Sequence, residues 1–165
     1  MTLLDKEPVK RVKKILKQFD PKLDVILLNS SARTALDASS SLGCDVGAII
    51  KSLLFKTERT FTLCLVSGDK KASFKKIKKI LDIKDVLMAS PDQVKNVTGF
   101  TIGGVSPIGH LKQTDIFIDN SLQRFEYLFA AAGHPNCVFR TNYFDLQKLT
   151  KGSIKDITEW DNQNY

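Results

Sequence analysis

The chain has 165 residues, of which 42% are hydrophobic and 26% charged, a composition typical of one soluble globular domain. It has no apolar run long enough to cross a bilayer and no signal-peptide pattern, and its three cysteines, Cys44, Cys64 and Cys137, fit neither a zinc motif nor a disulfide framework. The net charge of +7 permits a polyanionic partner such as RNA without requiring one. We therefore expect a cytoplasmic protein that uses no metal and no cofactor.

Hydrophobic periodicity and capping residues predict the elements of the first half of the chain. Thr34 and Asp37 form a capping-box pattern ahead of a short helix, and Gly43 follows its end. The runs IIKSLLF and FTLCLVS have the length and alternation of two paired strands. In order, we expect a helix over 8–19, a strand over 24–28, a polar loop over 30–33, a helix over 34–42, and strands over 49–55 and 61–67.

The second half alternates helices and strands less regularly. Ser90 and Pro91 are typical of a helix start, and Asn142 can cap a later helix. In order, we expect a helix over 73–81, a strand over 86–89, a helix over 90–97, strands over 115–119, 127–132 and 138–141, and a helix over 142–149. Because regular βαβ units are absent, the sequence predicts one α+β domain over residues 1–160, with a mixed, mostly antiparallel, barrel-like sheet surrounded by helices and a frayed tail over 161–165.

Lys51 is the first candidate for a chemical role, because it stands inside the apolar run IIKSLLF. A lysine ammonium within a buried strand costs free energy unless it reaches water or an anion. At the wall of a cleft it could bind a phosphate or a developing oxyanion. The alternative is an edge strand, from which the side chain extends into solvent.

The segment TGFTIGGVSPIGH, residues 98–110, is the second candidate. It holds four glycines but matches neither the Walker pattern nor the dinucleotide fingerprint. Gly103 and Gly104 can adopt positive φ and leave their amides free to face a carbonyl or phosphate oxygen. A plain connecting loop is the alternative.

Two further features could contribute to binding. The stretch AAAGH, Ala130 to His134, combines small residues with one of two histidines, so a ligand or another backbone segment could approach closely. A lysine cluster could contact phosphates, although a solvated helix face explains it equally well. It consists of Lys70, Lys71, Lys75, Lys76, Lys78 and Lys79. The sequence contains no pattern for a strong side-chain nucleophile.

The order of these motifs resembles the YbaK/prolyl-tRNA synthetase-associated editing domains. The resemblance covers residues 34–149 and depends most on the lysine of IIKSLLF and on the GGVSPIG loop. No synthetase catalytic or anticodon-binding region accompanies these motifs, so the chain resembles the free-standing trans-editing members. The resemblance implies a YbaK-like fold and an aminoacyl-tRNA deacylase that removes a wrong amino acid from tRNA, usually tRNA-Pro, without a metal or a covalent intermediate.

The resemblance also implies roles for individual residues. The catalytic set would be Lys51, which contacts a phosphate or supports the ester, and Gly103, Gly104 and Gly109, which shape the loop whose amides hold the carbonyl. The 2′-hydroxyl of the terminal ribose would help to position water. The expected substrate-binding residues are Thr34, Ile102, Val105, Ser106, Pro107, Ile108, His110, Asp119, Ala131, Gly133 and His134, with Ala132 as a further wall residue. The lysine cluster would steer the tRNA acceptor stem.

The substrate is less closely defined. Cysteine-editing relatives usually carry a serine where this chain has the alanines of AAAGH, so the sequence favours alanine or another small amino acid on tRNA-Pro over cysteine. The expected partners are tRNA and a prolyl-tRNA synthetase, with no membrane, and the expected state is a monomer or weak homodimer. A non-catalytic module that binds a tRNA end or an aminoacyl ligand, and regulates or recruits a partner, is the second interpretation. A charge-driven RNA chaperone is the third.

Overall fold

A computed structural model describes residues 2–29 and 34–162 of the chain. The predicted loop over 30–33 and the end of the predicted tail lie outside the described residues. The elements are, in chain order, η1 (Leu3–Asp5), α1 (Glu7–Phe19), β1 (Ile26–Leu27), α2 (Ala35–Leu42), η2 (Val46–Ala48), β2 (Ile50–Lys56), β3 (Phe61–Ser67), β4 (Lys70–Ala72), α3 (Phe74–Leu81), β5 (Leu87–Met88), α4 (Pro91–Thr98), β6 (Asp115–Asp119), η3 (Asn120–Arg124), β7 (Leu128–His134), β8 (Cys137–Thr141), α5 (Tyr143–Thr150), β9 (Ser153–Lys155) and β10 (Thr158–Trp160).

The helices begin where the capping residues predict. Thr34 accepts the Asp37 amide at 3.0 Å at the start of α2, and Gly43 ends this helix with φ 68°. At α4, Ser90 and Gln93 form a complete capping box, each side chain bonded to the other residue's amide at 3.2 and 2.9 Å. Local capping therefore defines these two helices.

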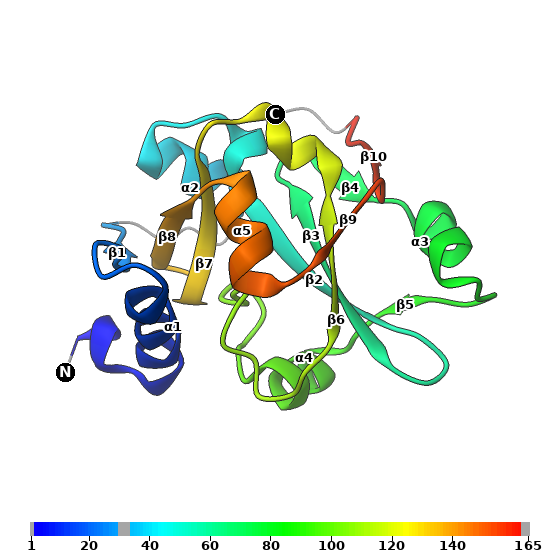
Figure 1. The fold of residues 1–165 in the computed structure, drawn as a ribbon, viewed down its shortest axis with the longest axis horizontal. Coiled ribbons are helices and arrows are strands. Elements are labelled where there is room, and N and C mark those ends of the chain that lie inside the picture. Colours follow the sequence, from blue (N-terminus) through cyan, green and yellow to red (C-terminus); the bar gives the residue numbers. More distant parts are fainter. Residues whose placement is uncertain (1, 30–33, 163–165) are drawn as a thin grey trace.

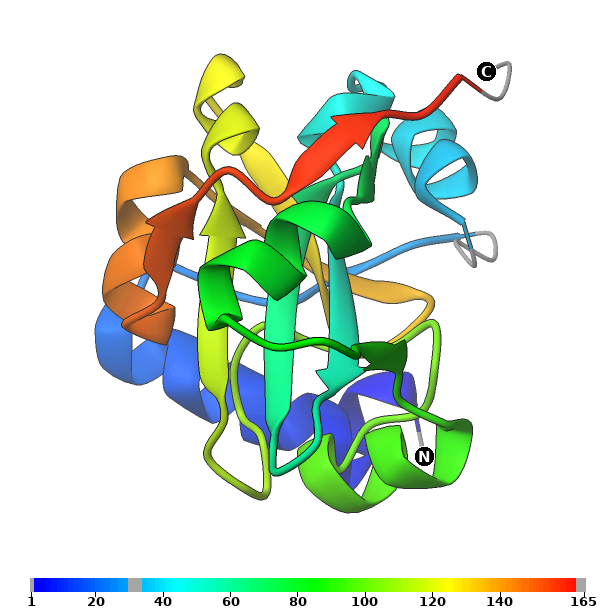
Figure 2. The same ribbon diagram turned by 90° about the vertical axis from the view of Figure 1, so that its right-hand side faces the viewer.

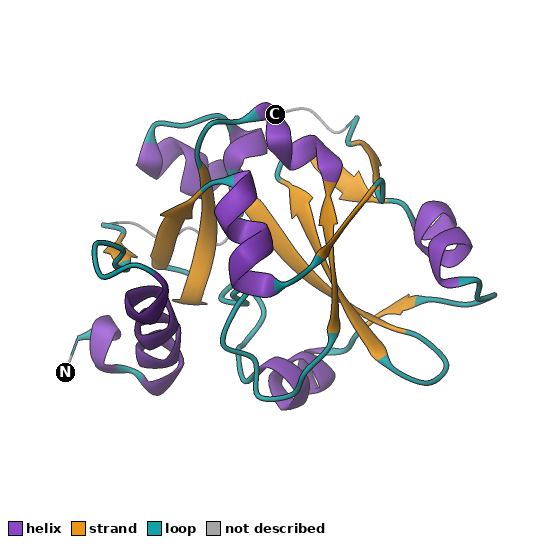
Figure 3. Ribbon diagram, viewed as in Figure 1, coloured by secondary structure: helices purple, strands orange, loops and turns teal. Residues whose placement is uncertain are grey.

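A five-stranded sheet in the order β5-β2-β3-β6-β9 forms the centre of the fold (Figures 1 and 3). Strand β2 pairs antiparallel with β3 and β5, whereas β6 pairs parallel with β3 and β9, so the sheet is mixed. Side chains alternate between its two faces. We call the face that carries Ile50, Leu54, Leu63, Leu65 and Ile118 the inner face, and the face that carries Phe55, Cys64, Val66 and Phe117 the outer face.

Each face of this sheet has its own cover. The inner face packs against the main core cluster, which includes residues of α1, α4, α5 and the small sheet β1-β8-β7. On the outer face, Ile77 of α3 and Ile157 beside the β4–β10 ribbon join a second cluster. In Figure 2 the green helix α3 crosses in front of the central sheet, and the blue helix α1 lies behind it. The sheet therefore separates α1 from α3.

The fold class is the predicted one, a single α+β domain with a mixed and mostly antiparallel arrangement of strands. Across the described residues, however, the strands form three separate sheets that do not close into a barrel. The predicted strand over 24–28 is reduced to β1, and the short strands β4, β9 and β10 were not predicted from the sequence. Within the described ranges, no helix has the length and apolar character needed to span a bilayer.

Candidate functional site

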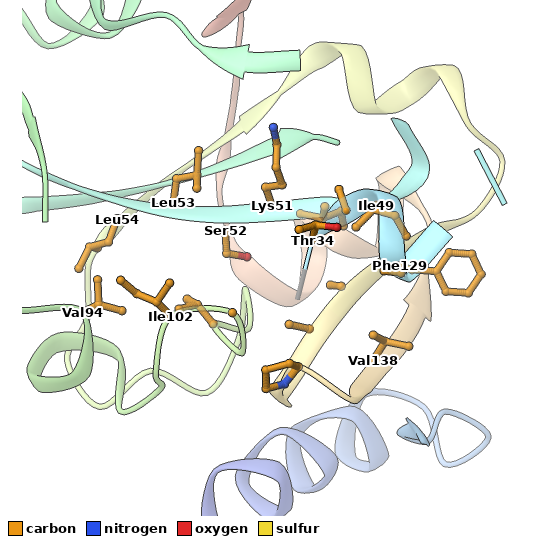
Figure 4. A pocket seen from close by; sticks show the side chains of 18 of the residues that line it. Thr34, Ile49, Lys51, Ser52, Leu53, Leu54, Val94, Ile102, Phe129 and Val138 are labelled. Carbon is orange, nitrogen blue, oxygen red and sulfur yellow. The ribbon is translucent and has the colours of Figure 1, made fainter. Parts of the chain in front are cut away.

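A cavity of about 400 Å³ lies between the inner face of β2, the small sheet and the segment 98–110, which we call the glycine loop (Figure 4). This volume is within the range of small-ligand sites. Its walls are mostly apolar. The lining residues are Thr34, Ala35, Ala38, Ile49, Ile50, Lys51, Ser52, Leu53, Leu54, Met88, Ala89, Val94, Ile102, Gly103, Val105, Phe129, Ala130, Ala131, Pro135 and Val138.

Ser52 is the polar group that sequence reasoning missed. Its Oγ is buried and has no hydrogen-bond partner among the described residues. Ser52 alternates with Lys51 along β2, and Figure 4 shows its hydroxyl on the same side of the strand as the glycine loop. A buried hydroxyl without a partner costs free energy, so a ligand atom that bonded it would bind more tightly.

Lys51 points in the opposite direction. Figure 4 shows its side chain on the far side of β2 from Ser52 and Ile102, and its Nζ donates to the carbonyl oxygen of Lys70 at 2.5 Å. Burial lowers the pKa of this amine, while Asp161 and Asp69 raise it. Lys51 thus lines the cavity without directing its amine into it, although the resemblance implied that this amine and the glycine loop act together on the ester.

The glycine loop reaches the cavity through Gly103, whose φ is 95°. The Gly104 amide donates to the carbonyl of Thr101 at 2.9 Å. The Gly103 amide has no acceptor among the described residues. Of the predicted catalytic glycines, only Gly103 therefore combines a place in the cavity wall with a free donor.

Close backbone packing explains two of the other glycines. A Cβ on Gly104 would lie 2.9 Å from the Cα of His134, which brings the glycine loop against β7. A Cβ on Gly133, at φ 93°, would lie 2.8 Å from the carbonyl oxygen of Pro8 at the start of α1. The loop, β7 and α1 thus form three successive layers beside the cavity.

Arg11 of α1 connects the two ends of the glycine loop, and no sequence pattern indicated this role. Its Nε donates to the Gly109 carbonyl at 2.5 Å and its Nη2 to the Thr98 carbonyl at 3.3 Å. The guanidinium also lies 4.7 Å from the centroid of the Phe100 ring. These contacts fix the loop to the N-terminal helix.

Six of the predicted site residues line the cavity: Thr34, Lys51, Ile102, Gly103, Val105 and Ala131. The others do not belong to the described lining: Gly104, Ser106, Pro107, Ile108, Gly109, His110, Asp119, Ala132, Gly133 and His134. Asp119, for example, is buried and accepts the Ile157 amide at 2.9 Å and the Thr158 hydroxyl at 3.0 Å, so it joins β6 to the C-terminal strands. His110 holds the Ser106 carbonyl at 2.6 Å within the loop.

The predicted lysine cluster lies along α3 and β4, on the outer-face side of the sheet. Lys76 bonds Asp156 at 2.9 Å, and Lys71 lies 3.6 Å from Glu159. The cavity, on the inner-face side, and this cluster are thus on opposite sides of the central sheet.

The match to known proteins now decides the family. The family described as "Aminoacyl-tRNA editing domain" matches residues 29–149. The chain belongs to this family. It is therefore an aminoacyl-tRNA deacylase with tRNA as its substrate class, and the cavity is the candidate active site of this editing domain.

Relatives agree with this membership. The editing domain is 33% identical over 147 residues to YwhH of Bacillus subtilis, and the aligned region covers 88% of this chain and 93% of YwhH. It is 27% identical over 143 residues to a proline–tRNA ligase of Caldicellulosiruptor bescii, but spans only 25% of that ligase. A crystal structure described as a candidate trans-editing enzyme for prolyl tRNA synthetase superposes with a TM-score of 0.87 at 34% identity, covering 93% of this chain and 98% of that one.

Proposed function

We propose that this editing domain acts in trans on mischarged tRNA-Pro and hydrolyses the ester of alanine or another small amino acid. The observation that carries the proposal is that Gly103, whose amide has no acceptor among the described residues, lines an apolar cavity. A preorganised amide donor of this kind stabilises the oxyanion that develops when an ester is attacked.

The proposed reaction needs no side-chain nucleophile. The aminoacyl group enters the cavity, and its carbonyl oxygen accepts a hydrogen bond from the Gly103 amide. A water molecule, positioned by the 2′-hydroxyl of the terminal ribose, bonds to the carbonyl carbon while the bond to the 3′-oxygen breaks. The proton released by the water passes to that 3′-oxygen, so the products are free amino acid and uncharged tRNA. Ser52 offers the buried hydroxyl that orients the aminoacyl group.

The walls suggest how the cavity would select a side chain. Val105, Ala130 and Ala131 contribute small apolar surfaces to the same cavity as Gly103. A synthetase rejects a side chain one methylene smaller by only about 1–3 kcal/mol, so a second site that accepts the smaller group is useful. Shape would exclude the cognate proline.

Deacylation of a substrate panel tests this proposal. Transfer RNA-Pro is charged in turn with labelled Ala, Cys, Ser, 2-aminobutyrate and Pro, and release of the amino acid is followed with and without protein. The proposal expects fast release of Ala or 2-aminobutyrate and no acceleration for Pro. Equal rates with and without protein for every member of the panel would contradict it.

One observation favours a second candidate, a non-catalytic module that binds the tRNA end or an aminoacyl ligand. The Lys51 amine points away from the cavity and bonds to the carbonyl of Lys70, so it would have to turn around β2 to support an ester. The same panel separates the two functions. Tight binding of charged tRNA without release of any amino acid would identify the module.

A further inference from the structure

The helix α1 packs against β7, a strand that also lines the candidate active site. The Gly133 backbone of β7 packs against Pro8, and the Arg11 side chain bonds to both ends of the glycine loop. In Figure 4 α1, in blue, lies on the same side of β2 as Ile102 and Val138. A ligand that extends out of the cavity past β7 therefore meets this helix.

Three lysines follow each other at intervals of four residues from the start of α1: Lys6, which is the N-cap residue, and Lys10 and Lys14 within the helix. Residues four apart share a helix face and are separated by about 6 Å along the axis. All three are exposed, and within the described residues none has a side-chain hydrogen bond or ion pair. We call these three residues the α1 lysine row.

The remaining lysines of the helix differ in their surroundings. Lys13 and Lys17 lie 3.6 and 3.4 Å from the carboxylate of Asp24, which offsets part of their charge. The row begins at the end of the helix that lies by His134 of β7. Burial lowers the pKa of this imidazole, and the nearby charge of Lys6 lowers it further. The unpaired positive charge of α1 is therefore concentrated in the row.

The basic cluster of α3 is less well placed. It lies across the central sheet from the cavity, and two of its members, Lys71 and Lys76, already face carboxylates. A tRNA whose 3′ end enters the cavity would have to pass around the sheet to reach it. Position and free charge thus both favour α1.

We propose that the α1 lysine row binds phosphates of the acceptor stem of the tRNA whose aminoacyl end occupies the cavity. This inference rests on the proposed function, because it places the substrate's ester in that cavity. Each lysine that neutralises a phosphate releases counterions, so binding through the row is steeply salt-dependent. The row then acts as the docking surface of the editing domain for its RNA.

Two triple variants with the same loss of charge compare the surfaces. The first is Lys6→Gln, Lys10→Gln and Lys14→Gln, and the second is Lys75→Gln, Lys78→Gln and Lys79→Gln, which changes the α3 lysines without carboxylate partners. The dissociation constant for tRNA-Pro is measured over a series of salt concentrations. We expect the α1 triple to weaken binding at least tenfold at low salt and to reduce the slope of log K against log salt by about 2–3.

The outcomes separate this inference from the proposed function. The α3 triple is expected to weaken binding less than the α1 triple; an equal or greater effect overturns the inference. A triple Lys→Arg variant of the α1 row should bind tRNA as the wild type does, and failure to do so also overturns the inference.

The wild type is tested in parallel on an aminoacyl ester of adenosine, which has no stem phosphates. If this ester is hydrolysed while both triple variants bind tRNA equally, the inference about the α1 lysine row is wrong and the proposed active site stands. If neither the ester nor charged tRNA is hydrolysed, the proposed function fails.

Discussion

The Nε of Arg11 donates to the carbonyl oxygen of Gly109 at 2.5 Å, so a side chain of the first helix holds a loop 98 residues further along the chain. This contact fixes the C-terminal end of the glycine loop, on the far side of Gly103 from Thr98. Replacing Arg11 with Ala should cost about 2 kcal/mol of unfolding free energy, since two carbonyls lose a charged donor. Urea denaturation measures this cost.

The effect on function distinguishes a loop clamp from a general stabiliser. We expect Arg11→Ala to lower kcat. Arg11→Lys can bond one carbonyl but not both in fork geometry, so its kcat should lie between those of Arg11→Ala and the wild type, with a KM close to that of Arg11→Ala. A variant that is destabilised as expected but deacylates at the wild-type rate would show that the clamp does not position the loop.

Ser52 and Thr62 form a matched pair, because both carry a buried hydroxyl without a partner among the described residues, and only Ser52 lines the cavity. Ser52→Ala and Thr62→Val should each leave the unfolding free energy unchanged or raise it by up to about 1 kcal/mol. Only Ser52→Ala should lower kcat/KM, by about tenfold for one lost hydrogen bond. Equal kcat/KM for the two variants would remove Ser52 from substrate binding.

Gly103 and Gly43 share a positive φ, 95° and 68°, but differ in position. An Ala at either site is strained and should cost roughly 1 kcal/mol of unfolding free energy. Gly43 has no heavy atom within 4 Å of an added Cβ and does not line the cavity, so Gly43→Ala controls for strain. We expect Gly103→Ala alone to lose most deacylation, because the added Cβ stands beside the amide that the ester must approach. Similar activities in both variants would argue against an ester bound at this point.

Lys51 gives the sharpest contrast between sequence and structure. Lys51→Met keeps the aliphatic stem and removes a partly buried ammonium whose pKa burial lowers, so folding should be unaffected. We expect both the unfolding curve and the rate of deacylation to be retained, because the amine points away from the cavity and has no step in the proposed reaction. Loss of deacylation in a folded Met variant would show instead that the amine turns around β2 to support the ester.

The pH dependence of stability should report His110. Burial, and secondarily Arg11, lowers the pKa of its imidazole below the usual 6.5, although the bond to Ser106 acts in the other direction. The unfolded chain therefore binds a proton at a higher pH than the folded chain, and the unfolding free energy falls as the pH drops from about 7 through 6.5 toward the folded pKa. His110→Gln should flatten this part of the profile. A slope identical to that of the wild type would contradict the assignment.

Local signals in the sequence predicted many of the elements. Capping at Thr34 and Ser90 fixed two helices, and the alternation of FTLCLVS predicted the bounds of β3, because these patterns depend on neighbours only a few residues away. The direction of the Lys51 side chain could not be predicted in this way. Both faces of β2 are covered, so alternation shows that Lys51 and Ser52 oppose each other but not which of them meets the cavity.

The contacts around the cavity depend on long-range packing. No local pattern connects Arg11 to Gly109, or Gly133 to Pro8, since only the folded arrangement of α1, β7 and the loop brings them together. Strands β9 and β10, of three residues each, are too short to show a period. The sequence thus identified the loop as a candidate, whereas the structure selected Gly103 within it and added Ser52.

We propose above all that the cavity beside Gly103 cleaves the ester of a mischarged tRNA. The most direct measurement is the rate of release of labelled alanine from Ala-tRNA-Pro, with Pro-tRNA-Pro as the cognate control. We expect rapid release of alanine by the wild-type protein, little by Gly103→Ala, and none of proline by either. Release of alanine at the same rate by wild type and Gly103→Ala, or at the uncatalysed rate by both, would contradict it.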